Sequence, residues 1–128
     1  MMLVRTHPYQ KLGTDFRFGA WVPPVDIFEQ NENLVIRAEI PGVSKDDLDV
    51  KIENGVLTLR GERKTSAEVT EANAYRLERV SGSFERSFKL PTTVDATKVD
   101  ATYKDGVLEV TVPKAETAKP KKVEIRAA

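Results

Sequence analysis

The sequence predicts an all-β protein folded as a β-sandwich, and this prediction depends on two β-hairpins and on the position of a proline. Residues 99–113 alternate apolar and polar side chains around Asp105-Gly106, a pair that supplies the positive φ angles of a two-residue hairpin turn. Residues 48–61 repeat this arrangement around Asn54-Gly55. Pro113 lacks the N–H that a continuing ladder needs, so it ends the second hairpin.

The other predicted elements follow the same period of two and are bounded by residues that favour turns. The predicted strands lie at residues 25–30, 34–40, 75–80 and 84–90. The predicted turns and connectors lie at residues 31–33, 41–42, 62–74, 81–83 and 92–98. Residues 44–47 predict a single helical turn with Ser44 as its cap.

The chain divides into three predicted segments. Residues 1–20 show no regular period and predict a flexible arm, residues 21–113 hold the sandwich, and residues 114–128 form a C-terminal extension that begins with a flexible linker. Near the end, Val123 and Ile125 would point the same way on an extended strand. Either this pair docks into a groove or onto a sheet edge, or the tail has no role.

The composition limits the function classes. The 128 residues carry 20 basic and 20 acidic side chains, so no net field favours nucleic acid or an anionic membrane as a partner. Cysteine is absent, and we find neither a membrane-spanning run nor the apolar core of a signal peptide. We therefore expect a soluble, cytoplasmic protein. The basic stretches at residues 60–64 and 119–122 are expected to be solvated surface.

Side chains suited to catalysis are scarce. The only histidine, His7, stands in the arm, so no Ser–His or Cys–His pair is expected. The carboxylates of Asp46, Asp47 and Asp49 are expected to lie in a solvated turn. No Gly-rich phosphate loop and no calcium-loop spacing is present, so neither a nucleotide nor a metal is expected. The sequence thus predicts a protein that is not an enzyme and has no catalytic residue and no cofactor.

Six segments, in the same order along the chain, resemble those of bacterial small heat shock proteins with an α-crystallin domain. Residues 101–108 match the Ala-x-x-x-x-Gly-Val-Leu signature of that family, and residues 38–43 resemble the segment with its Pro-Gly-Val turn. The segment Val123-x-Ile125 resembles the Ile-x-Ile motif of the family's tail. The other similar segments are residues 21–29, 55–63 and 82–91.

This resemblance implies an immunoglobulin-like sandwich that acts as an ATP-independent holdase, binding unfolding client proteins and suppressing their aggregation. It also implies a homodimer made by strand exchange, in which a strand of the long loop crosses to the partner subunit. The implied interface residues are Tyr75, Arg76 and Leu77 of the loop, Val25, Ile27 and Phe28 of the receiving strand, and Arg86 nearby in an ion pair.

The resemblance further implies that Val123 and Ile125 dock into a groove of a neighbouring subunit and so build a larger homo-oligomer. The implied groove residues are Leu48, Val50, Ile52, Val99, Ala101 and Tyr103. Clients are expected to bind apolar side chains of the arm, namely Leu3, Val4, Phe16 and Phe18. The arm lacks the longer apolar segment of most members, which argues against large oligomers. The alternative is a β-sandwich adaptor or co-chaperone module that binds one folded partner.

Overall fold

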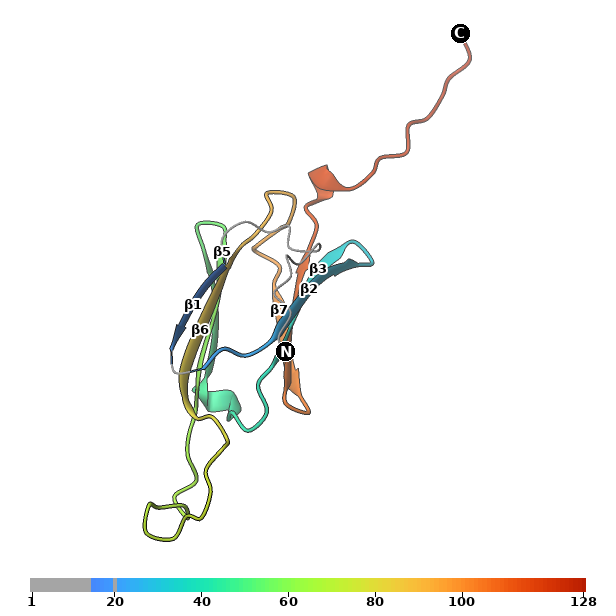
Figure 1. The fold of residues 1–128 in the computed structure, drawn as a ribbon. Coiled ribbons are helices and arrows are strands. Elements are labelled where there is room, and N and C mark those ends of the chain that lie inside the picture. Colours follow the sequence, from blue (N-terminus) through green and yellow to red (C-terminus); the bar gives the residue numbers. More distant parts are fainter. Residues whose placement is uncertain (1–14, 20) are drawn as a thin grey trace, which may run out of the picture.

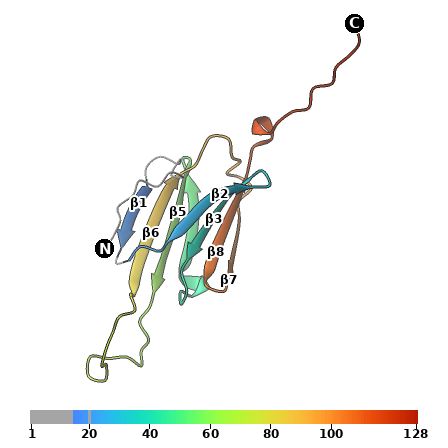
Figure 2. The ribbon, with the colours of Figure 1, turned by 45° about the vertical axis from the view of Figure 1, so that its right-hand side comes forward.

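Two antiparallel sheets lie face to face in the computed structural model, which describes residues 15–19, as backbone, and residues 21–128 (Figures 1 and 2). The first sheet has the order β1 (Asp15–Gly19), β6 (Gly82–Lys89), β5 (Val56–Arg63), β4 (Leu48–Glu53). The second has the order β2 (Val25–Gln30), β3 (Asn33–Glu39), β8 (Val107–Pro113), β7 (Asp100–Lys104). Two short 3-10 helices complete the elements, η1 (Lys45–Asp47) and η2 (Glu116–Ala118). The predicted all-β sandwich is confirmed.

The core lies between the sheets and is made of the inward-facing members of each alternating strand. On β5, Leu57 and Leu59 are buried while Thr58 and Arg60 face outward, as the period of two requires. The buried apolar residues of this cluster are Leu34, Ile36, Ala38, Ile40, Val43, Leu57, Leu59, Phe84, Phe88, Leu90, Leu108, Val110 and Val112.

The hairpin turns have the backbone that the sequence predicts. Asn54 and Gly55 have φ angles of 52° and 74°, and Asp105 and Gly106 have 54° and 77°. The turn between β2 and β3 also has two positive φ angles, 52° at Asn31 and 62° at Glu32. These three tight hairpins therefore close through the left-handed turn whose twist matches that of the strands.

The turn at Gly106 is also a packing contact. The carbonyl of Gly106 accepts a hydrogen bond of 2.8 Å from the amide of Ile40, at the end of β3. A Cβ atom at position 106 would lie 2.9 Å from the Cα of Pro41, closer than real Cβ contacts come. The hydroxyl of Tyr103 lies 2.9 Å from the carbonyl oxygen of Ile40 and 2.8 Å from that of Val43, to which it donates. The second hairpin therefore holds the segment that crosses from β3 to β4.

Replacing Gly106 by alanine is expected to lower the free energy of unfolding by about 3 kcal/mol, against about 1 kcal/mol for Gly55→Ala. Both glycines have a positive φ, so both substitutions carry left-handed strain of about 1 kcal/mol. Only at position 106 would the new Cβ also collide with Pro41, since nothing lies within 4 Å of a Cβ at position 55. Urea unfolding measures both losses, and equal losses would contradict the packing of the turn against Pro41.

Four local expectations about the sandwich and its two ends were wrong. The side chain of Ser44 makes no capping hydrogen bond, and the turn at η1 is closed by the backbone of Asp47 and Ser44 instead. No turn is present at residues 81–83, because β6 already begins at Gly82 and pairs with Arg63.

The other two corrections concern the ends of the sandwich. Five residues of the predicted irregular arm, Asp15–Gly19, form β1 and pair with β6. The predicted linker begins with structure, because Lys114 forms an isolated bridge with Val94 and is followed by η2. In both places the backbone gains partners from a strand or loop far away in sequence, which a local pattern does not reveal.

Candidate functional site

The strand β2 is one edge of the second sheet, so its outer backbone has no partner strand among the described residues. Val25 and Ile27 are half-buried and pack against the core, while Phe28 is half-buried beneath the guanidinium of Arg37, 4.8 Å from the ring centre. An open edge with this apolar lining is suited to pairing with a further strand.

The long loop, residues 64–81, extends from one end of the sandwich beyond both sheets (Figure 1). The predicted strand at residues 75–80 is not formed in the single chain. Tyr75 is fully exposed, and Leu77 and Val80 are 63% and 49% exposed. These large apolar side chains lie on a segment without a sheet partner, whereas the core-facing residues of the sandwich are covered.

The tip of the long loop is held by its own hydrogen bonds. Thr70 and Asn73 bond reciprocally, each amide to the other's side-chain oxygen, at 2.7 and 3.3 Å. The side-chain amide of Asn73 donates to the carbonyl of Glu68 at 2.8 Å, and the amide of Val69 donates to the carbonyl of Ser66 at 3.1 Å. The segment with Tyr75 therefore follows a turn of defined geometry.

Arg86 lies on the core-facing side of β6 and is only 6% exposed. Its guanidinium donates a hydrogen bond of 3.0 Å to the carbonyl of Pro23, just before β2, and lies 4.9 Å from the ring centre of Phe88. The arginine therefore ties the first sheet to the segment that leads into the open edge of the second. An ion pair of Arg86 across a dimer remains a prediction.

The strands β4 and β7 are the edges opposite β1 and β2 in their two sheets. The six predicted groove residues lie on or beside these edges. Five of them are half-buried and pack against the core, namely Leu48, Val50, Ile52, Val99 and Tyr103. The sixth, Ala101, is exposed. Since Tyr103 also bonds the crossing segment that leads towards β4, the structure places the two predicted groove edges in the same part of the sandwich.

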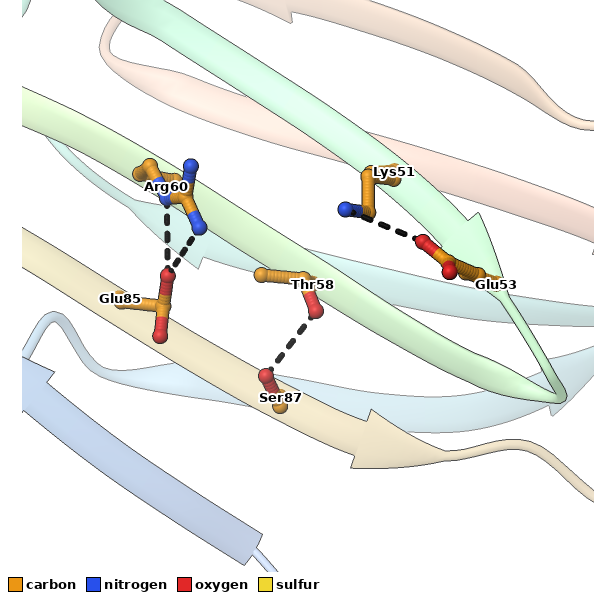
Figure 3. Close-up of polar contacts among 6 residues, drawn as sticks. All are labelled: Lys51, Glu53, Thr58, Arg60, Glu85 and Ser87. Atoms are coloured by element: carbon orange, nitrogen blue, oxygen red, sulfur yellow. Dashed lines mark hydrogen bonds and ion pairs between the residues drawn. The ribbon is translucent and has the colours of Figure 1, made fainter.

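Polar side chains on the outer face of β4, β5 and β6 are paired with one another (Figure 3). Arg60 bonds Glu85 at 2.6 and 2.8 Å, the hydroxyls of Thr58 and Ser87 lie 3.0 Å apart, and Lys51 lies 3.1 Å from Glu53. The prediction that residues 60–64 are solvated surface therefore holds for Arg60. A face of this kind offers little to an apolar ligand. The large apolar side chains exposed among the described residues are Val22, Val69, Tyr75, Leu77, Val80, Val123 and Ile125, and all but Val22 lie in the long loop or the tail.

The tail leaves the end of the sandwich opposite the long loop and runs away from both sheets (Figures 1 and 2). Val123 is 79% exposed and Ile125 is 93% exposed. The tail pair therefore does not contact the β4–β7 side of its own chain.

The base of the tail is fixed to the sandwich. The amide of Lys114 donates to the carbonyl of Glu32 at 3.0 Å, in the turn between β2 and β3. The Glu116 carboxylate bonds the ammonium of Lys119 at 3.0 Å and raises the pKa of that lysine. Nearby, hydrogen bonds from the hydroxyl and amide of Thr97 lower the pKa of Asp95, because they favour the carboxylate.

The predicted client-binding residues divide into two groups. Leu3 and Val4 lie outside the described residues. Phe16 and Phe18 lie in β1, where their backbones pair with those of Ser87 and Glu85.

Two residues that the sequence analysis did not single out connect several segments. The indole Nε1 of Trp21 donates to the carbonyl of Gly82 at 2.9 Å, and its ring meets Phe84 edge-on at 5.0 Å. The guanidinium of Arg63 lies 4.0 Å from the centre of the same indole ring. The only sequence signal would have been the single tryptophan at the domain entry.

Within residues 15–19 and 21–128, no group of three or more histidine, cysteine or acidic side chains is placed to hold a metal ion. In the same described part of the chain, no helix is long and apolar enough to cross a membrane.

The molecule has two antiparallel sheets with open edges, and apolar residues of its loop and tail are uncovered. Together these features define an α-crystallin type of sandwich. The chain belongs to the Hsp20/alpha crystallin family, whose model matches residues 26–126. The predicted family is thus confirmed.

Two relatives and a solved structure agree with this assignment. Small heat shock protein C4 of Rickettsia felis is 41% identical over 103 residues, covering 80% of this chain and 63% of that protein. The 18 kDa antigen 2 of Mycobacterium avium is 38% identical over 130 residues, covering 98% of this chain and 93% of the antigen. The structure of a small heat-shock protein from Xylella fastidiosa, described as having a distinct high order structure, gives a TM-score of 0.73 at 36% identity and covers 84% of this chain and 99% of that one.

Proposed function

We propose that this protein is an ATP-independent chaperone of the holdase type, which binds unfolding proteins and suppresses their aggregation. The observation that carries the proposal is the distribution of apolar surface. Tyr75, Leu77, Val123 and Ile125 are uncovered at opposite ends of a sandwich whose strands β4, β5 and β6 carry paired polar side chains on their outer face. Family membership supports the same function. No nucleotide, metal, nucleic acid or membrane takes part in this mechanism. The proposed cellular location of the protein is the cytoplasm.

The proposed dimer forms by exchange of the segment that contains Tyr75, Arg76 and Leu77, which pairs with the outer edge of the partner's β2. Support comes from the open edge of β2 and from the exposure of Tyr75 and Leu77, which would share one face of an extended strand. The hydrogen-bonded loop tip reduces the conformational entropy lost when this segment is ordered.

The proposed larger assembly forms when Val123 and Ile125 of one subunit dock against the β4–β7 side of another. Burying both side chains would contribute roughly 3–6 kcal/mol before losses. Ordering the remaining tail offsets much of this gain, so a single tail binds weakly, on the order of millimolar. Many tails acting together would hold an oligomer in which each contact still opens and closes.

In this proposal, subunits that leave the assembly expose the apolar β4–β7 side and the apolar residues of the arm, and both bind hydrophobic segments of clients. The half-burial of Leu48, Val50 and Ile52 supports this role, because their exposed parts are available when no tail covers them. The assembly therefore acts as a store of binding surface.

The test is suppression of aggregation of a heat-labile enzyme, measured by light scattering without nucleotide. The full chain should suppress scattering at near-stoichiometric ratios, whereas a variant with Leu3, Val4, Phe16 and Phe18 all replaced by serine should need several times more protein. The matched control replaces the polar residues Arg5, Thr6, Asp15 and Arg17 by serine.

Absence of suppression by the unchanged chain, together with binding to a native protein, would overturn the proposal in favour of the adaptor or co-chaperone alternative. Equal suppression by both serine variants would remove the arm from the mechanism.

A further inference from the structure

The two ends of the long loop are joined by one side chain. Arg63 is the last residue of β5, and its partner in the ladder is Gly82, the first residue of β6. Beyond this pair, the Nε of Arg63 donates a hydrogen bond of 2.8 Å to the carbonyl of Val80. The side chain thus extends the connection between the two strands into the loop, on the side from which Tyr75 and Leu77 depart.

The same guanidinium reaches two further segments. Its Nη1 donates to the carbonyl of Pro41 at 2.9 Å, in the turn after β3. Its Cζ lies over the indole ring of Trp21, 4.0 Å from the ring centre, a separation at which a cation–π attraction stabilises both groups. Trp21 is itself bonded to Gly82 and packed on Phe84, so the surface on which Arg63 lies is fixed to β6.

The backbone at Gly42 leaves room for the stem of Arg63. Gly42 has a φ angle of 86°, and a Cβ atom there would lie 3.3 Å from the Cδ of Arg63. A larger residue at position 42 would therefore press on the stem of the arginine. The turn after β3 and the arginine fit one another, which is an observation independent of the hydrogen bonds.

From this geometry we propose that Arg63 is a positioning residue for self-association: it sets the direction in which the long loop leaves the sandwich and so presents the segment at residues 75–79 to a second copy of the chain. The inference rests on the proposed strand exchange, and it adds a cause for the loop's direction. Lysine would not replace the arginine, because one ammonium group lacks the planar fork that reaches Val80, Pro41 and Trp21 together.

The test compares Arg63→Gln and Arg63→Lys with the control Arg60→Gln. Arg60 lies three positions earlier on the same strand and contacts only the outward-facing Glu85 among the pairs described above. Dimer dissociation is measured by sedimentation on dilution, and amide hydrogen exchange is measured across residues 64–81. Emission of Trp21, the only tryptophan, reports on the removal of the guanidinium.

We expect Arg63→Gln to weaken dimerisation at least tenfold and to speed hydrogen exchange in the loop, with Arg63→Lys restoring little of either. Arg60→Gln should change neither. A shift in Trp21 emission, with dimerisation and amide hydrogen exchange of the loop both unchanged, would overturn the proposed role of Arg63. The proposed strand exchange between subunits would not be affected. If the unchanged chain is a monomer at every concentration, the proposed strand exchange is wrong. Amide hydrogen exchange across residues 64–81 then still decides whether Arg63 holds the loop.

Discussion

Replacing Leu77 by proline is expected to convert the dimer into a folded monomer. Proline fixes φ at about −65° and removes a backbone N–H, so it would disrupt the ladder between the exchanged segment and the partner's β2 at a cost of about 2 kcal/mol. In a two-fold symmetric dimer each contact occurs twice, so the loss is about 4 kcal/mol, or on the order of a thousandfold in the dissociation constant. In the single chain Leu77 belongs to no strand, so the sandwich itself should be unaffected.

Ala67→Pro is the matched control for this prediction. Ala67 is the second residue of the turn that the amide of Val69 closes on the carbonyl of Ser66, and this position of a turn accepts proline. Sedimentation velocity should show a folded monomer for Leu77→Pro and a dimer for Ala67→Pro. A dimer in both variants would mean that the segment at residues 75–79 does not carry the interface.

Replacing Val123 and Ile125 together by glycine is expected to reduce any larger assembly to dimers. The change removes both apolar side chains of the tail, and with them the roughly 3–6 kcal/mol of burial that each docked tail contributes before losses. Since both residues are exposed in the single chain, the stability of the sandwich should not change. Light scattering after size exclusion gives the mass of the variant.

The control for the tail carries the same number of glycines. Glu124 and Arg126 alternate with the docking pair and would point the other way on an extended strand. The Glu124→Gly, Arg126→Gly double variant should therefore keep the mass of the unchanged protein. If both double variants have that mass, the tail is not the connector between dimers.

The hairpins could be predicted from the sequence because their information is local. Asp105-Gly106 and Asn54-Gly55 have intrinsic access to positive φ, and Leu108, Val110 and Val112 alternate without interruption. Glu32 also has a positive φ, at 62°, although glutamate has no preference for it. At Glu32 the φ angle is determined by the pairing of β2 with β3 and by the hydrogen bond from Lys114. The paired strands and Lys114 all lie outside the turn.

The features missed from the sequence depend on contacts between distant residues. The pairing of β1 with β6 joins positions about 70 residues apart, and Lys114, just before η2, bonds the turn between β2 and β3. Arg63 looked like part of a solvated basic stretch, yet it faces Trp21 while Arg60 on the same strand faces outward. A charge pattern alone does not distinguish these two arginines, because their difference comes from what the fold places above each of them.

The most direct test of strand exchange with weak tail contacts is the absolute mass of the unchanged protein in solution, measured by light scattering after size exclusion across a concentration series. The account predicts a dimer at low concentration that grows into larger assemblies as the concentration rises, because many weak tail contacts add only when subunits are abundant. A strict monomer at every concentration would contradict it, since neither the open edge of β2 nor the exposed tail would then have a second copy to bind.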